Sequence, residues 1–213
     1  MKFDDLLALV GDEPLFETAL LLAGDVRAAE VHRQLARWRR AGRIVQLRRG
    51  VYALAAPFRR VAPHPFVLAN RMEPGSYVST ESALAHHGLI PEHVPVTTSV
   101  GACRPGRFVT DLGSFQFRHV KRELRFGYRL VDLGGRQSAF VATPEKALLD
   151  LVYLRSGAAR REFLSELRLQ NLERIDAQSL HRMATRTASP KLRRAAGLVD
   201  QLAREEAEEY QSL

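Results

Sequence analysis

Arginine is concentrated in one short stretch of this chain, and arginine is the side chain best suited to binding phosphate. Residues 27–60 contain ten arginines and a single acidic side chain, Glu30. A guanidinium group presents a planar fork of donors that matches a phosphate or the edge of guanine. Each duplex phosphate that such a group neutralises releases counterions, and that release drives binding. The stretch therefore predicts contact with nucleic acid.

The spacing of these arginines predicts the helix that would position them. Residues 27–41 form an amphipathic pattern that ends at Gly42, because glycine readily adopts the left-handed conformation that closes a helix. The predicted helix has an apolar stripe for a core and a cationic stripe on the opposite side. The apolar stripe consists of Val31, Leu35 and Trp38, and the cationic stripe of Arg33, Arg37 and Arg40. An ordinary surface helix with solvated arginines would show the same distribution of apolar and cationic residues around its axis.

A basic hairpin directly after this helix favours DNA binding over a solvated surface. Residues 43–47 and 51–55 are the expected strands, and residues 48–50 form the turn. Arginines at such a tip can reach phosphates or a narrow minor groove. The combination predicts the recognition helix and wing of a winged helix-turn-helix. The expected DNA-contacting residues are Arg27, Arg33, Arg37, Arg40, Arg43, Arg48 and Arg49.

Composition narrows the class of protein further. The 213 residues carry a net charge of +8 and a pI of about 10.2, which favours an acidic partner such as double-stranded DNA. The single cysteine, Cys103, excludes an intramolecular disulfide and a cysteine-rich zinc site. Neither a signal peptide nor an apolar run of about 18 residues is present. We expect a cytoplasmic protein that makes no contact with a membrane.

The chain is predicted to have an α+β fold in two domains. Pro57, Pro63 and Pro65 indicate an extended segment, so the boundary is placed between a winged helix-turn-helix at residues 1–60 and a second domain at 66–213. Helices at 4–10 and 14–23 and a turn at Gly24 and Asp25 are expected before the recognition helix. The second domain is expected to be mixed α/β with a helical C-terminal lobe. Its expected helices are 80–87, 143–154, 160–169, 176–184 and 190–210, and its expected strands 96–100, 114–120, 127–133 and 138–141.

Three motifs together resemble one known family. Residues 25–54, DVRAAEVHRQLARWRRAGRIVQLRRGVYAL, resemble the N-terminal winged helix of AbiEi-type antitoxins, with residues 49–52 as the hallmark ending of the wing. Residues 77–92, YVSTESALAHHGLIPE, resemble the motif that opens the C-terminal domain of that family. Residues 142–154, ATPEKALLDLVYL, resemble the motif that begins its helical lobe. These motifs occur in the family's order along nearly the whole chain.

The resemblance implies two activities, and neither of them is catalytic. The first domain would bind inverted repeats in its own promoter and repress a type IV toxin–antitoxin operon of the kind linked to phage abortive infection. The second would neutralise an AbiEii-type nucleotidyltransferase toxin, without requiring a stable complex. The oligomeric state stays open, including binding as cooperating monomers. One alternative is a stand-alone transcription factor whose C-terminal domain serves oligomerisation or ligand sensing. Another is a nucleic-acid enzyme with the winged helix as a tether.

The second domain offers few residues for catalysis. Glu145 and Asp150 lack the paired arrangement that general acid–base chemistry needs. Lys146 and Asp150 form an i,i+4 pair, which contributes only a few tenths of a kcal/mol when exposed. Three histidines match no zinc spacing: His86, His87 and His93. We therefore expect no catalytic residue, no metal and no cofactor.

A second basic patch lies in the middle of the chain. If strands 114–120 and 127–133 pair, the patch lies on and beside their connection. There it could contact the toxin, RNA or DNA, and a solvated hairpin tip is an equally good interpretation. The residues of this second basic patch are Arg118, Lys121, Arg122, Arg125 and Arg129.

Overall fold

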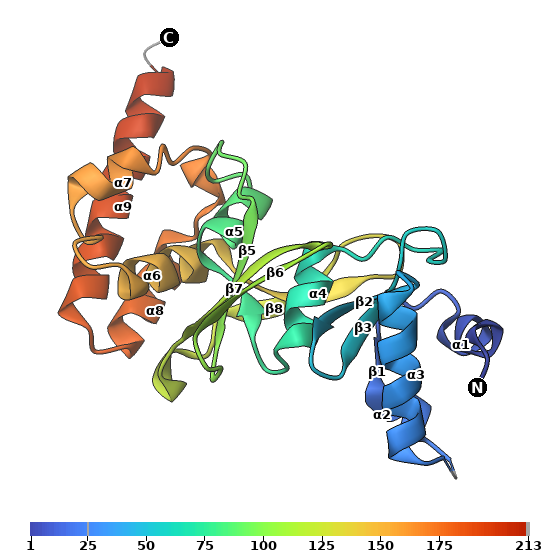
Figure 1. The fold of residues 1–213 in the computed structure, drawn as a ribbon. Coiled ribbons are helices and arrows are strands. Elements are labelled where there is room, and N and C mark those ends of the chain that lie inside the picture. The colour runs from blue at the N-terminus through green and yellow to red at the C-terminus, as the bar shows by residue number, and fades with distance from the viewer. Residues whose placement is uncertain (25, 212–213) are drawn as a thin grey trace.

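The molecule is an elongated arrangement of helices and two sheets. A computed structural model describes residues 1–24 and 26–211, with the side chains of all of these except 207 and 209–211. The N-terminal elements lie at one end, a six-stranded sheet lies in the middle, and the C-terminal helices lie at the other end (Figure 1). The expected turn residue Asp25 lies outside the described residues. Among those described, no helix is long and apolar enough to cross a membrane.

The N-terminal elements form a small unit around three helices and a three-stranded sheet. Its elements are α1 (Phe3–Val10), β1 (Phe16–Glu17), α2 (Thr18–Leu22), α3 (Ala28–Arg40), β2 (Ile44–Arg48) and β3 (Val51–Leu54). The strand order is β1-β3-β2, with both pairs antiparallel. The expected apolar stripe of α3 is confirmed, because Val31, Leu35 and Trp38 are all buried. Gly42 follows the helix with a φ of +66°, as its stop position requires.

The expected helix over residues 14–23 is wrong at its beginning. Phe16 and Glu17 form a short strand that pairs with Tyr52 and Val51, and only residues 18–22 are helical. Phe16 also stacks on Tyr52, with ring centroids 5.7 Å apart. This cross-strand contact joins residues more than thirty positions apart. Such long-range pairing outweighs the local helical pattern.

The rest of the chain forms a mixed sheet followed by helices. The elements up to the sheet's last strand are α4 (Pro65–Met72), β4 (Tyr77–Val78), α5 (Thr80–His86), β5 (Val96–Gly101), β6 (Gly106–Thr110), β7 (Gly113–His119), η1 (Arg122–Leu124), β8 (Tyr128–Asp132) and β9 (Ser138–Ala142). The helices that follow are α6 (Pro144–Leu154), α7 (Arg161–Glu166), η2 (Leu172–Arg174), α8 (Ala177–Arg186) and α9 (Pro190–Gln211). The sheet order is β6-β7-β5-β4-β9-β8. The predicted α+β class is confirmed.

Apart from the short 3-10 helices η1 and η2, three of these elements were not predicted, and one predicted pairing is wrong. Helix α4 begins where an extended segment was expected, since Pro65 occupies its first position and Nδ1 of His64 accepts the backbone N–H of Phe66 at 3.1 Å. Strands β4 and β6 are the other two. Strand β7 does not pair with β8: it lies between β6 and β5, while β8 is at the opposite edge beside β9. The second basic patch is therefore not the tip of one hairpin.

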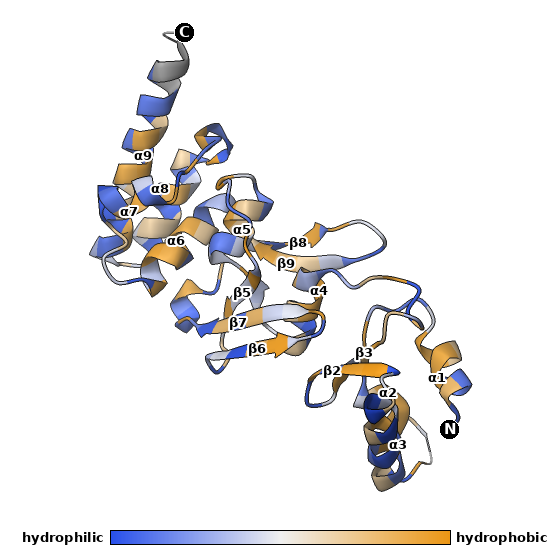
Figure 2. Ribbon diagram, turned by 45° about the horizontal axis from the view of Figure 1, so that its top comes forward, coloured by the Kyte–Doolittle hydropathy of each residue, from blue (hydrophilic) through white to orange (hydrophobic). Residues whose placement is uncertain are grey.

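Two hydrophobic cores lie along the molecule, and the hairpin contributes to both. The smaller core joins α1, α3 and the hairpin through residues such as Trp38 and Tyr52. The larger core fills the space between the six-stranded sheet and helices α4–α9. Leu47 and Val51 of the hairpin belong to the larger core. Figure 2 shows the hydrophilic exposed side of α3 next to the hydrophobic strand β2.

Candidate nucleic-acid interface

Helix α3 presents its cationic stripe to solvent. Arg33, Arg37 and Arg40 are exposed, and they line a groove of about 590 Å³ together with Gln34 and Ala36. No ion pair within 4.0 Å engages these three arginines among the described residues. Three positive charges thus lie along one helix face, and Glu30, which lines the same groove, forms no ion pair with them in the described part of the chain. That face can approach the polyanionic surface of a duplex without first breaking a protein contact.

Two further predicted arginines lie at the ends of this helix. Arg27 is the N-cap residue of α3 and is exposed. Arg43 follows the helix, and its guanidinium carbon lies 4.9 Å from the ring centre of Phe3. Stacking on the ring holds the planar group in one orientation while its edge stays exposed. The structure therefore places a cation at each end of the α3 stripe.

The turn of the hairpin is held against α2. Gly50 has a φ of +82°, which few other residues adopt without strain, and its carbonyl accepts the backbone N–H of Thr18 at 2.9 Å. The preceding Arg49 is exposed, and the described residues form no ion pair with it. A fixed turn therefore presents Arg49 to solvent.

Arg48, the other arginine of the predicted tip, contacts the protein itself. A bulge between Gln46 and Arg48 shifts the strand register. The Arg48 guanidinium forms an ion pair with Glu73 and donates to the carbonyl of Met72 at 2.6 Å. These contacts join the hairpin to the end of α4. DNA contact by Arg48 and Arg49 stays a prediction, and the structure shows that the two side chains differ: Glu73 engages Arg48, whereas no ion pair engages Arg49 among the described residues.

Sequence reasoning missed two arginines beside the hairpin. Arg39 and Arg59 line a cleft of about 650 Å³ between the hairpin and the β6–β7 turn, which Arg48 and Arg49 also line. Arg39 donates to the side-chain oxygen of Gln46 at 2.5 Å, which fixes its position over β2. The dense run of arginines was visible in the sequence. Which of them face the cleft depended on the fold of the hairpin.

The second basic patch is dispersed over the second sheet. Arg118 lies on β7 and Arg129 on β8, with three strands between them. Lys121 and Arg122 are exposed on the connection that crosses from one strand to the other. Arg125 donates from Nε to the carbonyl of Val120 at 3.2 Å. The five residues are therefore not gathered at one hairpin tip, because β7 and β8 do not pair, and their contact with a toxin or nucleic acid stays a prediction.

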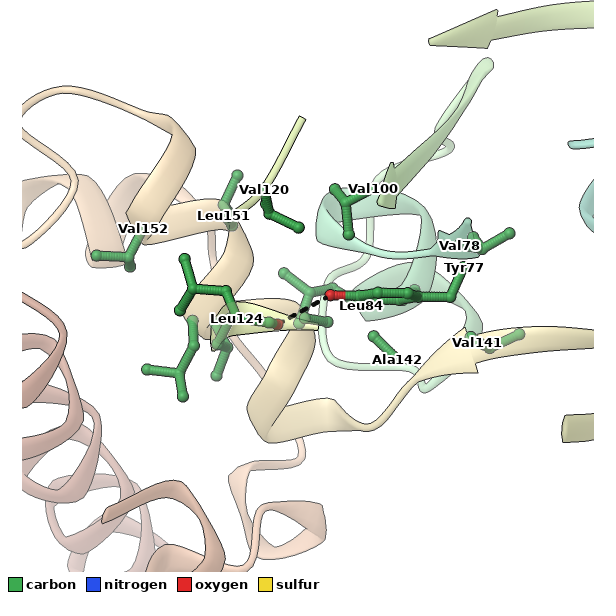
Figure 3. Close-up of a cluster of buried hydrophobic side chains, with 14 of the residues drawn as sticks. Tyr77, Val78, Leu84, Val100, Val120, Leu124, Val141, Ala142, Leu151 and Val152 are labelled. Atoms are coloured by element: carbon green, nitrogen blue, oxygen red, sulfur yellow. Dashed lines mark hydrogen bonds between the residues drawn. The ribbon is translucent and has the colours of Figure 1, made fainter. Parts of the chain in front are cut away.

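The pair Lys146–Asp150 is buried, so the small contribution of an exposed i,i+4 pair does not apply to it. Each side chain is only 1% exposed. Asp150 also accepts hydrogen bonds from the hydroxyls of Tyr77 at 3.0 Å and Ser79 at 2.7 Å. Burial raises the pKa of Asp150 and lowers that of Lys146, and each partner opposes the shift of the other. Tyr77 lies among the apolar side chains of the larger core, with its hydroxyl also 3.5 Å from the carbonyl of Leu124 (Figure 3).

His87 and the remaining carboxylate, Glu145, have structural partners. His87 lies with Nε2 2.8 Å from the carbonyl of Ala142, and burial lowers its pKa. Desolvation and the neighbouring His87 and His64 lower the pKa of His86. Glu145 accepts the backbone N–H of Asp176 at 2.9 Å. Within residues 1–24 and 26–211, no three His, Cys, Asp or Glu side chains come together to hold a metal ion.

Comparison with known proteins identifies the segment that carries these arginines. Residues 20–55 match the family model described as a transcriptional regulator, the AbiEi antitoxin. The match spans α2, α3 and the hairpin, and so includes the α3 stripe and Arg49. It confirms the resemblance to the AbiEi-type antitoxins. No curated protein matches the chain.

Proposed function

We propose that this regulator of the AbiEi antitoxin type is a winged helix-turn-helix protein that binds its own promoter and represses it. The row of exposed arginines on α3, which form no ion pair with any described residue, is continued by Arg49 at the hairpin turn and is the observation that carries the proposal. A helix with a cationic outer face and a basic hairpin beside it match the major groove and the adjacent phosphates. Inverted repeats are the expected operator.

The two parts of this surface would make different contacts. The α3 stripe would enter the major groove, where Arg33 or Arg37 could form paired hydrogen bonds with guanine. Ala29 and Ala36 lie beside these arginines on the same helix face and are small enough for the helix to approach the bases. Arg49 would contact phosphate beside the groove. Specificity then comes from α3, and the hairpin adds affinity that depends on salt.

We also propose that the chain opposes a cognate toxin of the AbiEii nucleotidyltransferase type, in the cytoplasm and without catalysis of its own. The support is the family match together with the structural partners found for Glu145 and Asp150. A stand-alone transcription factor would share the α3 surface but would not protect cells from such a toxin. Co-expression with a toxin of the AbiEii nucleotidyltransferase type separates the two, because only the antitoxin would restore growth.

Operator binding is tested with the DNA upstream of the chain's own gene. A gel shift across a salt series, with a scrambled duplex as the control, should show specific binding that weakens steeply with salt. Equal binding to both duplexes would contradict the repressor proposal. Protection from toxin should persist in the full-length double variant Arg33→Ala, Arg37→Ala. The full chain is needed because Leu47 and Val51 of the hairpin complete the larger core.

A further inference from the structure

A small polar pocket lies in the second part of the chain, far from the α3 stripe in the sequence. It measures about 80 Å³ and lies where the beginning of α5, strands β5 and β7 and the end of α6 meet. Thr80, Thr98, Gln116, Arg118 and Arg155 contribute to its lining. Glu81, Leu151 and Leu154 complete the lining, so hydroxyl, amide, guanidinium and carboxylate groups meet apolar side chains around a space large enough for a few non-hydrogen atoms.

Thr80 has two features that an ordinary structural residue avoids. Its φ is +52°, a conformation that a β-branched side chain adopts only under strain. Its side chain is buried at 2% exposure, and its Oγ1 makes no hydrogen bond with any described residue. A buried polar atom without a partner destabilises the fold. Thr80 lines the pocket, so an oxygen-rich ligand that reaches the buried Oγ1 would give that hydroxyl its missing partner.

The surrounding structure holds Thr80 in this conformation. The hydroxyl of the preceding Ser79 donates to the buried carboxylate of Asp150, and the backbone N–H of Ser79 donates to the carbonyl of Thr98 at 3.0 Å. Asp150 is in turn fixed by Lys146. Backbone strain persists only where such contacts impose it, and it is commonly found at ligand sites. The buried ion pair therefore serves to shape one wall of the pocket.

The charge of the pocket favours an anion. Arg155 forms an ion pair with Glu81, which holds its guanidinium at the rim. Arg118 is half-buried on β7, and no ion pair engages it among the described residues. The lining thus carries two positive charges and one negative charge. A guanidinium shielded from bulk water and left without a counter-ion is an attractive site for an oxyanion.

We propose that this pocket binds a single phosphoryl group, as free phosphate or as the terminal phosphate of a small metabolite. Arg118 would donate two hydrogen bonds to its oxygens, Thr80 would donate one from Oγ1, and the Gln116 amide would donate another. Arg155 would close the outer side. This site does not depend on the DNA-binding proposal. The α3 stripe and Arg49 lie within residues 20–55, and none of the pocket residues does.

The test is calorimetric titration of the full-length protein with inorganic phosphate at constant ionic strength. Two variants remove a ligand each: Arg118→Gln and Thr80→Gly. Glycine adopts the φ of Thr80 without strain, so Thr80→Gly should fold at least as stably as wild type while lacking the hydroxyl. The matched control is Arg104→Gln, which removes the same charge from an exposed position outside the pocket.

We expect phosphate to bind the wild type and Arg104→Gln equally, and each pocket variant at least tenfold more weakly. Equal affinity for all four proteins would overturn the proposal, since it would mean that phosphate binds elsewhere on the basic surface. No binding to the wild type at millimolar phosphate would also overturn it. A parallel titration with a nucleoside monophosphate identifies the source: tighter binding than inorganic phosphate indicates a metabolite, and equal or weaker binding indicates the free anion.

Discussion

Arg48 and Arg49 are neighbours in the sequence, and their replacement should have different consequences. Arg49 is exposed at the hairpin turn, whereas Arg48 forms an ion pair with Glu73 and donates to the Met72 carbonyl. We expect Arg49→Ala to weaken operator binding without changing stability. We expect Arg48→Ala to lower stability while leaving the salt dependence of binding nearly as it is.

The size of each effect follows from the surroundings of the two side chains. On duplex DNA each neutralised phosphate contributes about 0.9 to the slope of log affinity against log salt, so Arg49→Ala should lose roughly threefold more affinity at about 50 mM than at about 200 mM salt. Arg48 and Glu73 are 39% and 19% exposed, so solvent screens their pair. Its loss should cost about 1 kcal/mol, lowering Tm by roughly 2–4 °C.

Fluorescence anisotropy with a labelled operator duplex, measured across a salt series, gives the slopes, and thermal unfolding gives the stabilities. Arg104→Ala serves as the control, since it removes an equal charge from an exposed position outside the α3 stripe and the hairpin. If Arg48→Ala lowered the slope as much as Arg49→Ala, Arg48 would have to leave Glu73 for a phosphate. If neither variant changed the slope, the hairpin turn would not touch DNA.

Three further variants, the first of them a double replacement, test helix α3, the buried pair Lys146–Asp150 and His87. Arg33→Ala with Arg37→Ala should reduce discrimination between operator and scrambled duplex by about 1–3 kcal/mol, and unchanged discrimination in the anisotropy assay would remove α3 from the groove. Asp150→Asn should cost about 3–5 kcal/mol of unfolding free energy in urea, because it strands the buried Lys146 charge, and a loss below about 1 kcal/mol would contradict that. Burial lowers the pKa of His87, so the unfolded chain protonates first and stability should fall as pH drops below about 6.5. His87→Gln, whose amide can still donate to the same carbonyl, should flatten a pH series of urea unfolding curves.

The elements that local patterns specify were predictable from the sequence. Helix α3 has an uninterrupted amphipathic period and a glycine stop, so its core residues and exposed arginines could both be assigned. Strand β1 could not, because its two residues pair with β3 far along the chain. The partner of Arg48 was equally hidden, since nothing near it in the sequence indicates Glu73. A bulge one residue before it decides which way the arginine points.

The two motifs in the second part of the chain owe their residue types to one shared structure. Residues 77–80 contribute Tyr77 and Ser79, and residues 145–150 contribute Lys146 and Asp150, all joined in one buried network. A lysine one turn before an aspartate is common on exposed helices, so sequence spacing alone could not distinguish a buried pair. Its stability depends on the two hydroxyl donors from the other motif, because a buried carboxylate needs every oxygen satisfied. Each motif is therefore explained by the other, and Thr80, which the network holds at a φ of +52°, lies at the pocket for which we propose a phosphoryl group.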